Sequence, residues 1–145
     1  MQSTPTKTDL FRVEHLHDDF AKIYQPGIWN PFHVLSAPDF GWPHDHPFSL
    51  DLDIVIGGYE EEVYSLQPDG TWSMEVFERR AGTSHRVEAG TIHRIVEHYK
   101  GFTVSYAKPG PYEQDWHHFR ADEHGIWRAP GNNLNEWQLL IPRNS

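Results

Sequence analysis

The sequence predicts an all-β domain, a small sandwich or barrel, because of the spacing of its prolines and glycines and the residue types between them. Proline and glycine recur at short intervals between Pro26 and Pro111. The segments between them are short and rich in Val, Ile, Tyr, Trp and Phe, which fit the pleated, half-buried surface of a strand. A spacing of roughly ten residues is typical of antiparallel strands joined by tight turns. The expected strands are residues 50–56, 59–66, 71–78, 84–88, 92–96 and 102–106.

The N-terminal part is expected to differ from the strand-rich middle. Residues 1–8 are polar and show no periodicity, so they are predicted to form a loose arm. Further on, two aspartates precede the apolar residues of segment 20–24, and Pro26-Gly27 follows it. Acidic residues before an apolar group and a Pro-Gly pair after it are typical helix boundaries. One short helix is therefore expected here.

The later elements follow from the turns. Pro68-Asp69-Gly70 lies between two strand segments, and there proline presets its φ angle while glycine can adopt a positive one. A hairpin is expected at this point. From Ala107 onward the strand pattern weakens, so residues 107–145 are predicted to be loop-rich. Within them, residues 136–141 fit either a final strand or one helical turn.

Length, composition and charge limit the classes of function. A chain of 145 residues corresponds to one domain, taken as residues 1–145. We expect a cytoplasmic protein without membrane contact, because we find neither a long apolar run nor a signal-peptide pattern. The formal charge of −9, without a basic cluster, argues against nucleic acid as a partner. Because the sequence has no cysteine, disulfides and thiolate metal ligands are excluded.

Histidine is unusually frequent, with eleven in the chain. Neutral imidazole is the commonest metal ligand in proteins. His44 and His46 are two residues apart, and on a strand such residues project from the same face, so both rings can reach one ion. A third ligand must come from elsewhere. His93, which follows a turn at Gly90, is the preferred candidate, and His85, in a similar tetrapeptide, is the alternative.

Two spaced motifs within residues 41–97 resemble the two sequence motifs of the cupin superfamily. The first is His44-x-His46-x4-Asp51-x6-Gly58, with Asp51 where the family has Glu. The second is Gly82-x5-Glu88-x-Gly90-x2-His93, with Glu88 where proline is usual. The resemblance implies a small cupin-type barrel, the double-stranded β-helix or jelly roll. It also implies one divalent metal ion bound by His44, His46, Asp51 and His93.

Asp51 is the open question within this ligand set. It lies five residues after His46, an odd spacing, so it reaches the same face only if the strand bends near Pro47. Asp53 shares the face of Asp51, and two buried carboxylates would need the metal or hydrogen bonds to stay ionised. Asp53 and Tyr106 are the candidate catalytic residues, as groups that could move protons.

A narrower resemblance is to the thiol dioxygenase branch of the cupins, the cysteine dioxygenase-like proteins, and to small uncharacterised bacterial and phage cupins. The residues that carry it are His44-Asp45-His46, Ser49, Gly58, Glu61 and the run that includes Ser105. The resemblance implies a non-haem Fe(II) dioxygenase acting on a small polar molecule, and a homodimer. Fe(II) is favoured, and Zn, Ni, Mn or Cu would suit the same ligands.

The chain also departs from this branch. Ala107 and Pro109 stand where the branch carries His and Tyr, and no arginine lies between Gly27 and His44 to bind a substrate carboxylate. Cysteine is therefore not expected to be the substrate. Two alternative functions remain open at the level of sequence: a redox-neutral metal-dependent isomerase or lyase, and a small-molecule-binding cupin without catalysis.

Overall fold

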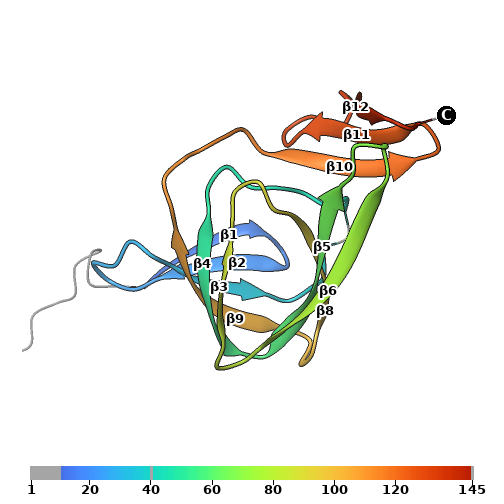
Figure 1. The fold of residues 1–145 in the computed structure, drawn as a ribbon. Helices are drawn as coiled ribbons and strands as arrows, with labels where there is room; N and C mark the ends of the chain where they lie inside the picture. The colour runs from blue at the N-terminus through green and yellow to red at the C-terminus, as the bar shows by residue number, and fades with distance from the viewer. Residues whose placement is uncertain (1–10, 40, 145) are drawn as a thin grey trace, which may run out of the picture.

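The structure, a computed structural model, describes residues 11–39 and 41–144, which form twelve β-strands and no helix (Figure 1). The strands are β1 (Arg12–His17), β2 (Phe20–Tyr24), β3 (Phe32–Leu35), β4 (Leu50–Ile56), β5 (Gly58–Leu66), β6 (Trp72–Arg80), β7 (Ser84–Val87), β8 (Ile92–His98), β9 (Thr103–Pro109), β10 (His117–Asp122), β11 (Gly125–Pro130) and β12 (Gln138–Pro142). The predicted all-β class is confirmed. Within the described ranges, no helix is long and apolar enough to cross a membrane.

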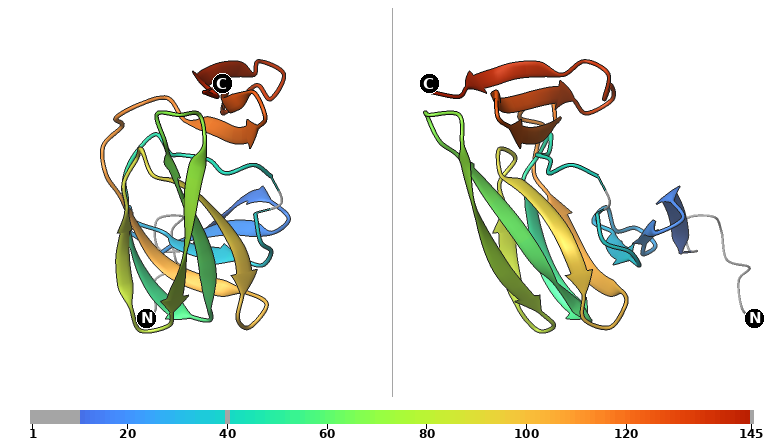
Figure 2. Two further views of the ribbon diagram at one scale, coloured as in Figure 1. Left: turned by 45° about the vertical axis from the view of Figure 1, so that its right-hand side comes forward. Right: turned by 90° about the vertical axis from the view of Figure 1, so that its right-hand side faces the viewer.

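The strands form three antiparallel sheets. One has six strands in the order β1-β2-β3-β9-β4-β7, and the other two are β6-β5-β8 and β10-β11-β12. The six-stranded sheet and the β6-β5-β8 sheet face each other, and the third sheet lies over one end of the pair (Figure 2). Ile54 of β4 packs against Tyr59 of β5 and Ile95 of β8, so the core joins the two facing sheets.

Alternation along residues 50–54 of β4 decides which of these side chains face the interior. Leu52 and Ile54 are buried, and Leu50 and Leu52 line an internal cavity. The aspartates between them, Asp51 and Asp53, therefore project outward, because successive side chains of a strand point to opposite faces. Asp51, the predicted fourth ligand, and Asp53, a predicted catalytic residue, therefore both lie on the outer face of β4.

The predicted hairpin at Pro68-Asp69-Gly70 is present and joins β5 to β6. Gly70 has a φ angle of +83°, and Asp69 Oδ1 accepts a hydrogen bond of 3.0 Å from the Thr71 amide. A Cβ atom at Gly70 would lie 2.5 Å from the carbonyl oxygen of Pro142. This turn therefore needs glycine both for its φ angle and for the close passage of the C-terminal chain.

The short N-terminal helix was a wrong prediction, because residues 20–24 form strand β2. Asp18 and Asp19 form the turn of a β1–β2 hairpin rather than the start of a helix. A five-residue segment is too short for a stable helix, whereas pairing with β3 satisfies its backbone groups. Residues 1–8, predicted as a loose arm, lie outside the described residues.

The C-terminal segment contains more strand than its sequence pattern indicates. Strands β10, β11 and β12 form a sheet of their own, and residues 138–142 adopt the strand alternative. Phe119 of β10 and Ile126 of β11 are buried against Ile92 of β8. This sheet therefore covers the end of the two facing sheets where β8 begins, next to the predicted metal ligands.

Candidate metal centre

Three of the predicted ligands converge. His44, His46 and His93 each offer a ring nitrogen, and these nitrogens all lie within 4.8 Å of one another. The ring centroids are 5.1 Å apart for His44 and His46, 5.0 Å for His44 and His93, and 4.8 Å for His46 and His93. These three histidines could hold a metal ion.

Backbone hydrogen bonds explain why the three rings meet. The amides of His44 and His93 each donate to the carbonyl oxygen of the other, both at 3.0 Å. The His46 amide donates to the Ala89 carbonyl oxygen, also at 3.0 Å. The segment before β4 is thus fastened to β8 and to the turn that precedes it. Because His44 and His46 lie two residues apart on this extended segment, both rings project toward His93.

Two ring nitrogens of the trio are buried without a partner. Within the part of the chain that the structure describes, His93 Nε2 and His46 Nδ1 have no hydrogen-bond partner. Leaving a buried polar atom unsatisfied costs about 1–3 kcal/mol, so such atoms call for an explanation. A metal ion bound by these nitrogens would supply one, and the donor set fits such an ion.

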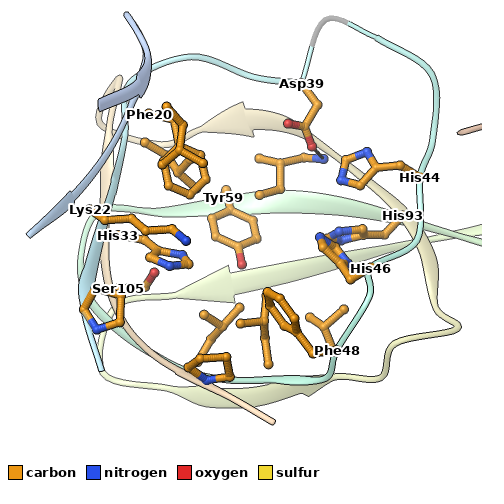
Figure 3. A pocket seen from close by; sticks show the side chains of 18 of the residues that line it. Phe20, Lys22, His33, Asp39, His44, His46, Phe48, Tyr59, His93 and Ser105 are labelled. Carbon is orange, nitrogen blue, oxygen red and sulfur yellow. Dashed lines mark hydrogen bonds between the residues drawn. The ribbon is translucent and has the colours of Figure 1, made fainter. Parts of the chain in front are cut away.

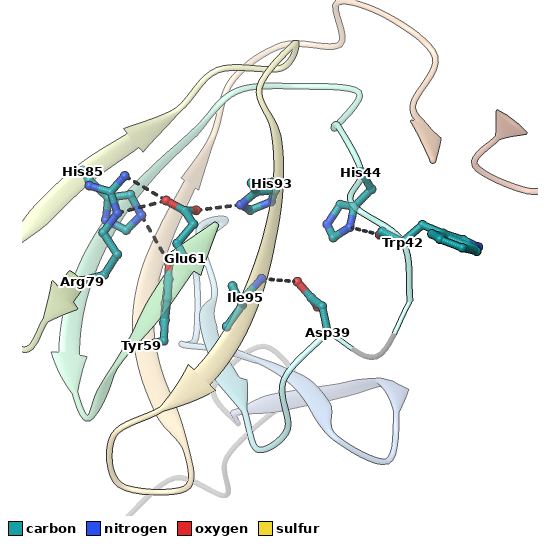
Figure 4. Close-up of polar contacts among 9 residues, drawn as sticks. All are labelled: Asp39, Trp42, His44, Tyr59, Glu61, Arg79, His85, His93 and Ile95. Carbon is teal, nitrogen blue, oxygen red and sulfur yellow. Dashed lines mark hydrogen bonds and ion pairs between the residues drawn. The ribbon is translucent and has the colours of Figure 1, made fainter. Parts of the chain in front are cut away.

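Glu61 on β5 orients His93. It is 1% exposed, and its Oε2 atom accepts a hydrogen bond of 2.6 Å from His93 Nδ1 (Figure 4). Its Oε1 atom accepts hydrogen bonds from Arg79 Nε at 3.0 Å and from Arg79 Nη2 at 2.8 Å. A carboxylate on Nδ1 fixes the ring and its tautomer and leaves Nε2 as the free ligand atom.

The charge state of Glu61 follows from these contacts. Burial alone would raise the pKa of its carboxyl group, but the hydrogen bonds from His93 and Arg79, together with the charge of Arg79, outweigh burial and lower the pKa to about 2. Glu61 is therefore a carboxylate at neutral pH. In the sequence, Glu61 is only one residue of the family resemblance, and its spacing assigns it no role. The signal that could have revealed it is the alternation of β5, in which Tyr59 and Glu61 share the inward face.

The other two imidazoles are held neutral. Burial, followed by the neighbouring His93 ring, lowers the pKa of His44 to about 4. Burial likewise lowers the pKa of His46 to about 2, with His93 and His44 adding to the effect. Only a neutral imidazole has the free electron pair that a metal ion requires. At neutral pH these rings are therefore in the protonation state that binds metal.

Asp51 does not join the trio, which corrects its prediction as the fourth ligand. Its half-exposed carboxylate lies 3.1 Å from Arg86 Nη1 on the outer surface. The chain bends at residues 47–48, but His46, Phe48, Leu50 and Leu52 all line the cavity, so the bend does not bring Asp51 to the inward face.

The two predicted catalytic residues also face away from the cavity. Asp53 accepts a hydrogen bond of 2.7 Å from the Ser84 hydroxyl and lies 3.6 Å from the Lys108 amine. Tyr106 packs against Phe32, with ring centroids 5.1 Å apart. On β9 it is the adjacent Ser105 that is buried and lines the cavity.

His85, the alternative third ligand, lies in a different contact. Its Nε2 atom is hydrogen-bonded to the Tyr59 hydroxyl at 3.3 Å, and it is not one of the three converging histidines. Burial and the charge of Arg79 lower its pKa to about 4. The geometry therefore favours His93.

A cavity of about 290 Å³ opens beside the trio, between the facing sheets (Figure 3). His44, His46 and His93 form one side of it. The opposite side carries polar side chains, and the floor is apolar. Tyr59 stands between these sides, and its ring faces the cavity. Besides the trio, the cavity is lined by residues that include Phe20, Lys22, His33, Asp39, Phe48, Leu50, Leu52, Tyr59, Val87 and Ser105.

Comparisons with known proteins give one structural likeness. No family model matches the chain, and no curated protein matches its sequence. Among solved structures, the chain is similar to the crystal structure of the Momordica charantia 7S globulin, with 17% sequence identity and a TM-score of 0.49. The match covers 79% of this chain and 37% of the globulin chain, so this chain spans little more than a third of that protein.

Proposed function

We propose that this chain is a metal-binding cupin in which His44, His46 and His93 hold one divalent ion beside the internal cavity. The observation that carries the proposal is the convergence of these three imidazoles, with two buried ring nitrogens that lack a partner. The spacing of the two sequence motifs supports it independently, since those motifs selected the same histidines.

The residues of the site have separate tasks under this proposal. His44 and His46 supply neutral nitrogen ligands from one extended segment, and His93 supplies Nε2 from β8. Glu61 holds the His93 ring through Nδ1. Three protein ligands leave coordination positions open toward the cavity, which is typical of catalytic rather than structural metal sites. A metal ion there would act as a Lewis acid or, if it is iron, support oxygen chemistry.

The finer proposal is a non-haem Fe(II) dioxygenase for a small polar molecule. Three converging imidazoles beside a small cavity, two of them held neutral by burial, support it, together with the resemblance to the thiol dioxygenase branch. The redox-neutral isomerase or lyase needed Asp53 or Tyr106 to move protons, and both lie outside the cavity. Tyr59 lines the cavity, and the hydrogen bond between its hydroxyl and His85 gives it a partner for a proton.

Metal analysis tests the metal site directly. Freshly purified protein is expected to contain about one equivalent of metal, and His44→Ala and His93→Ala are expected to lose it. His124→Ala is the matched control, because that side chain is exposed on a distant turn. If both trio variants fold, as judged by circular dichroism, and retain the metal, the assignment of the site is wrong.

Oxygen consumption with a panel of thiols and carboxylates then tests the dioxygenase proposal. That proposal is rejected if iron-loaded protein consumes no oxygen with any of them.

A further inference from the structure

A row of three polar side chains lies on the cavity wall across from the histidine trio. Lys22 on β2, His33 on β3 and Ser105 on β9 come from three adjacent strands. Lys22 pairs with His33, and His33 pairs with Ser105, as directly opposed residues. Directly opposed residues of neighbouring strands project from the same face. Figure 3 shows the three side chains together inside the cavity, on the side away from the trio.

The cavity lining carries its positive and negative charges on opposite sides. Among the described residues that line it, only Lys22 and Asp39 carry a formal charge at neutral pH. Asp39 lies on the same side as the trio, and its Oδ2 atom accepts a hydrogen bond of 2.8 Å from the Ile95 amide. No ion pair of Lys22 is found within residues 11–39 and 41–144. In a chain of net charge −9, Lys22 is thus the only cation among the described lining residues, and it forms no ion pair even with Glu14, its directly opposed neighbour on β1.

The two neighbours of Lys22 in the row, His33 and Ser105, add hydrogen-bond donors to its charge. Burial, followed by the charge of Lys22, lowers the pKa of His33 to about 4, so its ring is neutral at pH 7 and can donate one hydrogen bond. The Ser105 hydroxyl, on a residue that is 2% exposed, can donate another. One ammonium and two neutral donors suit a singly charged carboxylate. A phosphate dianion would call for more positive charge than the single lysine provides.

The remaining surface sets the shape of the ligand. Phe48, Leu50, Leu52 and Val87 also line the cavity and give it an apolar floor. A volume of about 290 Å³ lies at the lower end of the range for small-molecule sites. The space therefore suits a small molecule with a polar group at each end and an apolar chain between them.

We infer that the cavity binds a small aliphatic carboxylate, with its carboxylate group on the row of Lys22, His33 and Ser105. The chain of the ligand lies over the apolar floor, and a second polar group at its other end faces His44, His46 and His93. Only this last contact rests on the proposed metal function. The contact with Lys22 is independent of it.

A homologous series of ω-hydroxycarboxylates, with about two to five methylene groups, tests the inference by calorimetry. Each acid is compared with the diol of the same length, which lacks the charge. Metal-free wild-type protein is expected to bind at least one acid more tightly than its diol. Lys22→Met is expected to weaken that binding about tenfold or more without changing the affinity for the diol, and Lys22→Arg to restore part of it. Zinc loading is expected to strengthen binding of the acid whose hydroxyl reaches the trio.

Controls separate this inference from the proposed function. Lys108→Met removes an exposed lysine of the outer surface and is expected to change nothing. Ser105→Ala is a second, milder variant for the case in which Lys22→Met does not fold. The inference is overturned if wild-type protein binds no acid at millimolar concentration, binds acids and diols equally, or is unaffected by both cavity variants. Carboxylate binding that depends on Lys22, in a protein that takes up no metal, would reject the metal site and keep the inference.

Discussion

At the scale of single residues, the site depends on the carboxylate that sequence reasoning left without a role. Glu61 is almost fully buried and holds two partners at once, His93 through one oxygen and Arg79 through the other. A buried carboxylate is stable only if such partners offset its lost hydration. The ion pair with Arg79 is therefore part of what keeps His93 in the orientation that a metal ligand needs.

Replacing Glu61 with Gln should weaken metal binding. The amide removes the charge that raises the basicity of His93 and can present NH2 instead of an acceptor to Nδ1, so we expect the metal affinity to fall about 10- to 100-fold. Competition with a chromophoric chelator measures this affinity. Glu62→Gln is the matched control, since Glu62 pairs with Arg94 and not with the trio. Equal affinities in the two variants would show that Glu61 does not act through His93.

Buried neutral histidines should make the metal-free protein sensitive to mild acid. The pKa values of His33 and His85 are lowered from 6.5 to about 4, in both cases mainly by burial. Between these values the unfolded chain binds protons that the folded chain does not, so folding stability is complete above pH 6.5 and falls as the pH approaches 4. Urea unfolding at pH 7 and pH 5 measures the effect. His33→Gln should lose less stability over this interval than wild type, and an unchanged loss would contradict the assignment.

At the scale of the elements, the sequence predicted most strands because turns and β-formers punctuate it locally. The segments for β4 to β9 and the turn at Gly70 are confirmed. The odd spacing between His46 and Asp51 made ligation by Asp51 an open question. The structure answers it, because this spacing leaves Asp51 on the outer surface. The helix prediction was wrong because the local boundary signals at Asp18 and Asp19 do not reveal that residues 20–24 can pair with β3. The three-histidine set could be predicted from the sequence, because His44 and His46 are two residues apart and His93 follows the turn at Gly90.

The hairpin turn at Gly70 should be less tolerant of substitution than another glycine of similar φ angle. Gly70 and Gly82 have φ angles of +83° and +86°, but a Cβ atom meets the backbone of Pro142 only at Gly70, and nothing lies within 4 Å at Gly82. Both alanine variants carry the strain of a positive φ angle, of about 1 kcal/mol. We expect Gly70→Ala to lose about 1–3 kcal/mol more than Gly82→Ala in urea unfolding. Equal losses would mean that the C-terminal chain does not pack against this turn.

At the scale of the whole molecule, the cavity results from contacts that no local pattern specifies. The row of Lys22, His33 and Ser105 spans β2, β3 and β9, which are adjacent only because β3 pairs with both β2 and β9. The contact of Glu61 with His93 likewise depends on the register of β5 against β8. Sequence spacing reveals residues that act within one turn or strand. It does not reveal partners that a sheet brings together across many residues, which is why this wall of the cavity was not predicted.

Metal binding should therefore stabilise the whole fold. The trio joins β8 of one facing sheet to the segment that leads into β4 of the other, so an ion held by all three ligands binds the folded chain and not the unfolded one. Free metal at a hundredfold excess over its dissociation constant adds about 2.7 kcal/mol. For a domain of this size we expect the melting temperature to rise by roughly 5–10 °C on addition of Zn²⁺ and to return on addition of EDTA. His124→Ala should show the same rise, and His44→Ala should show none. A rise of equal size in His44→Ala would place the bound metal elsewhere, and no rise in wild type would argue against a site built by folding.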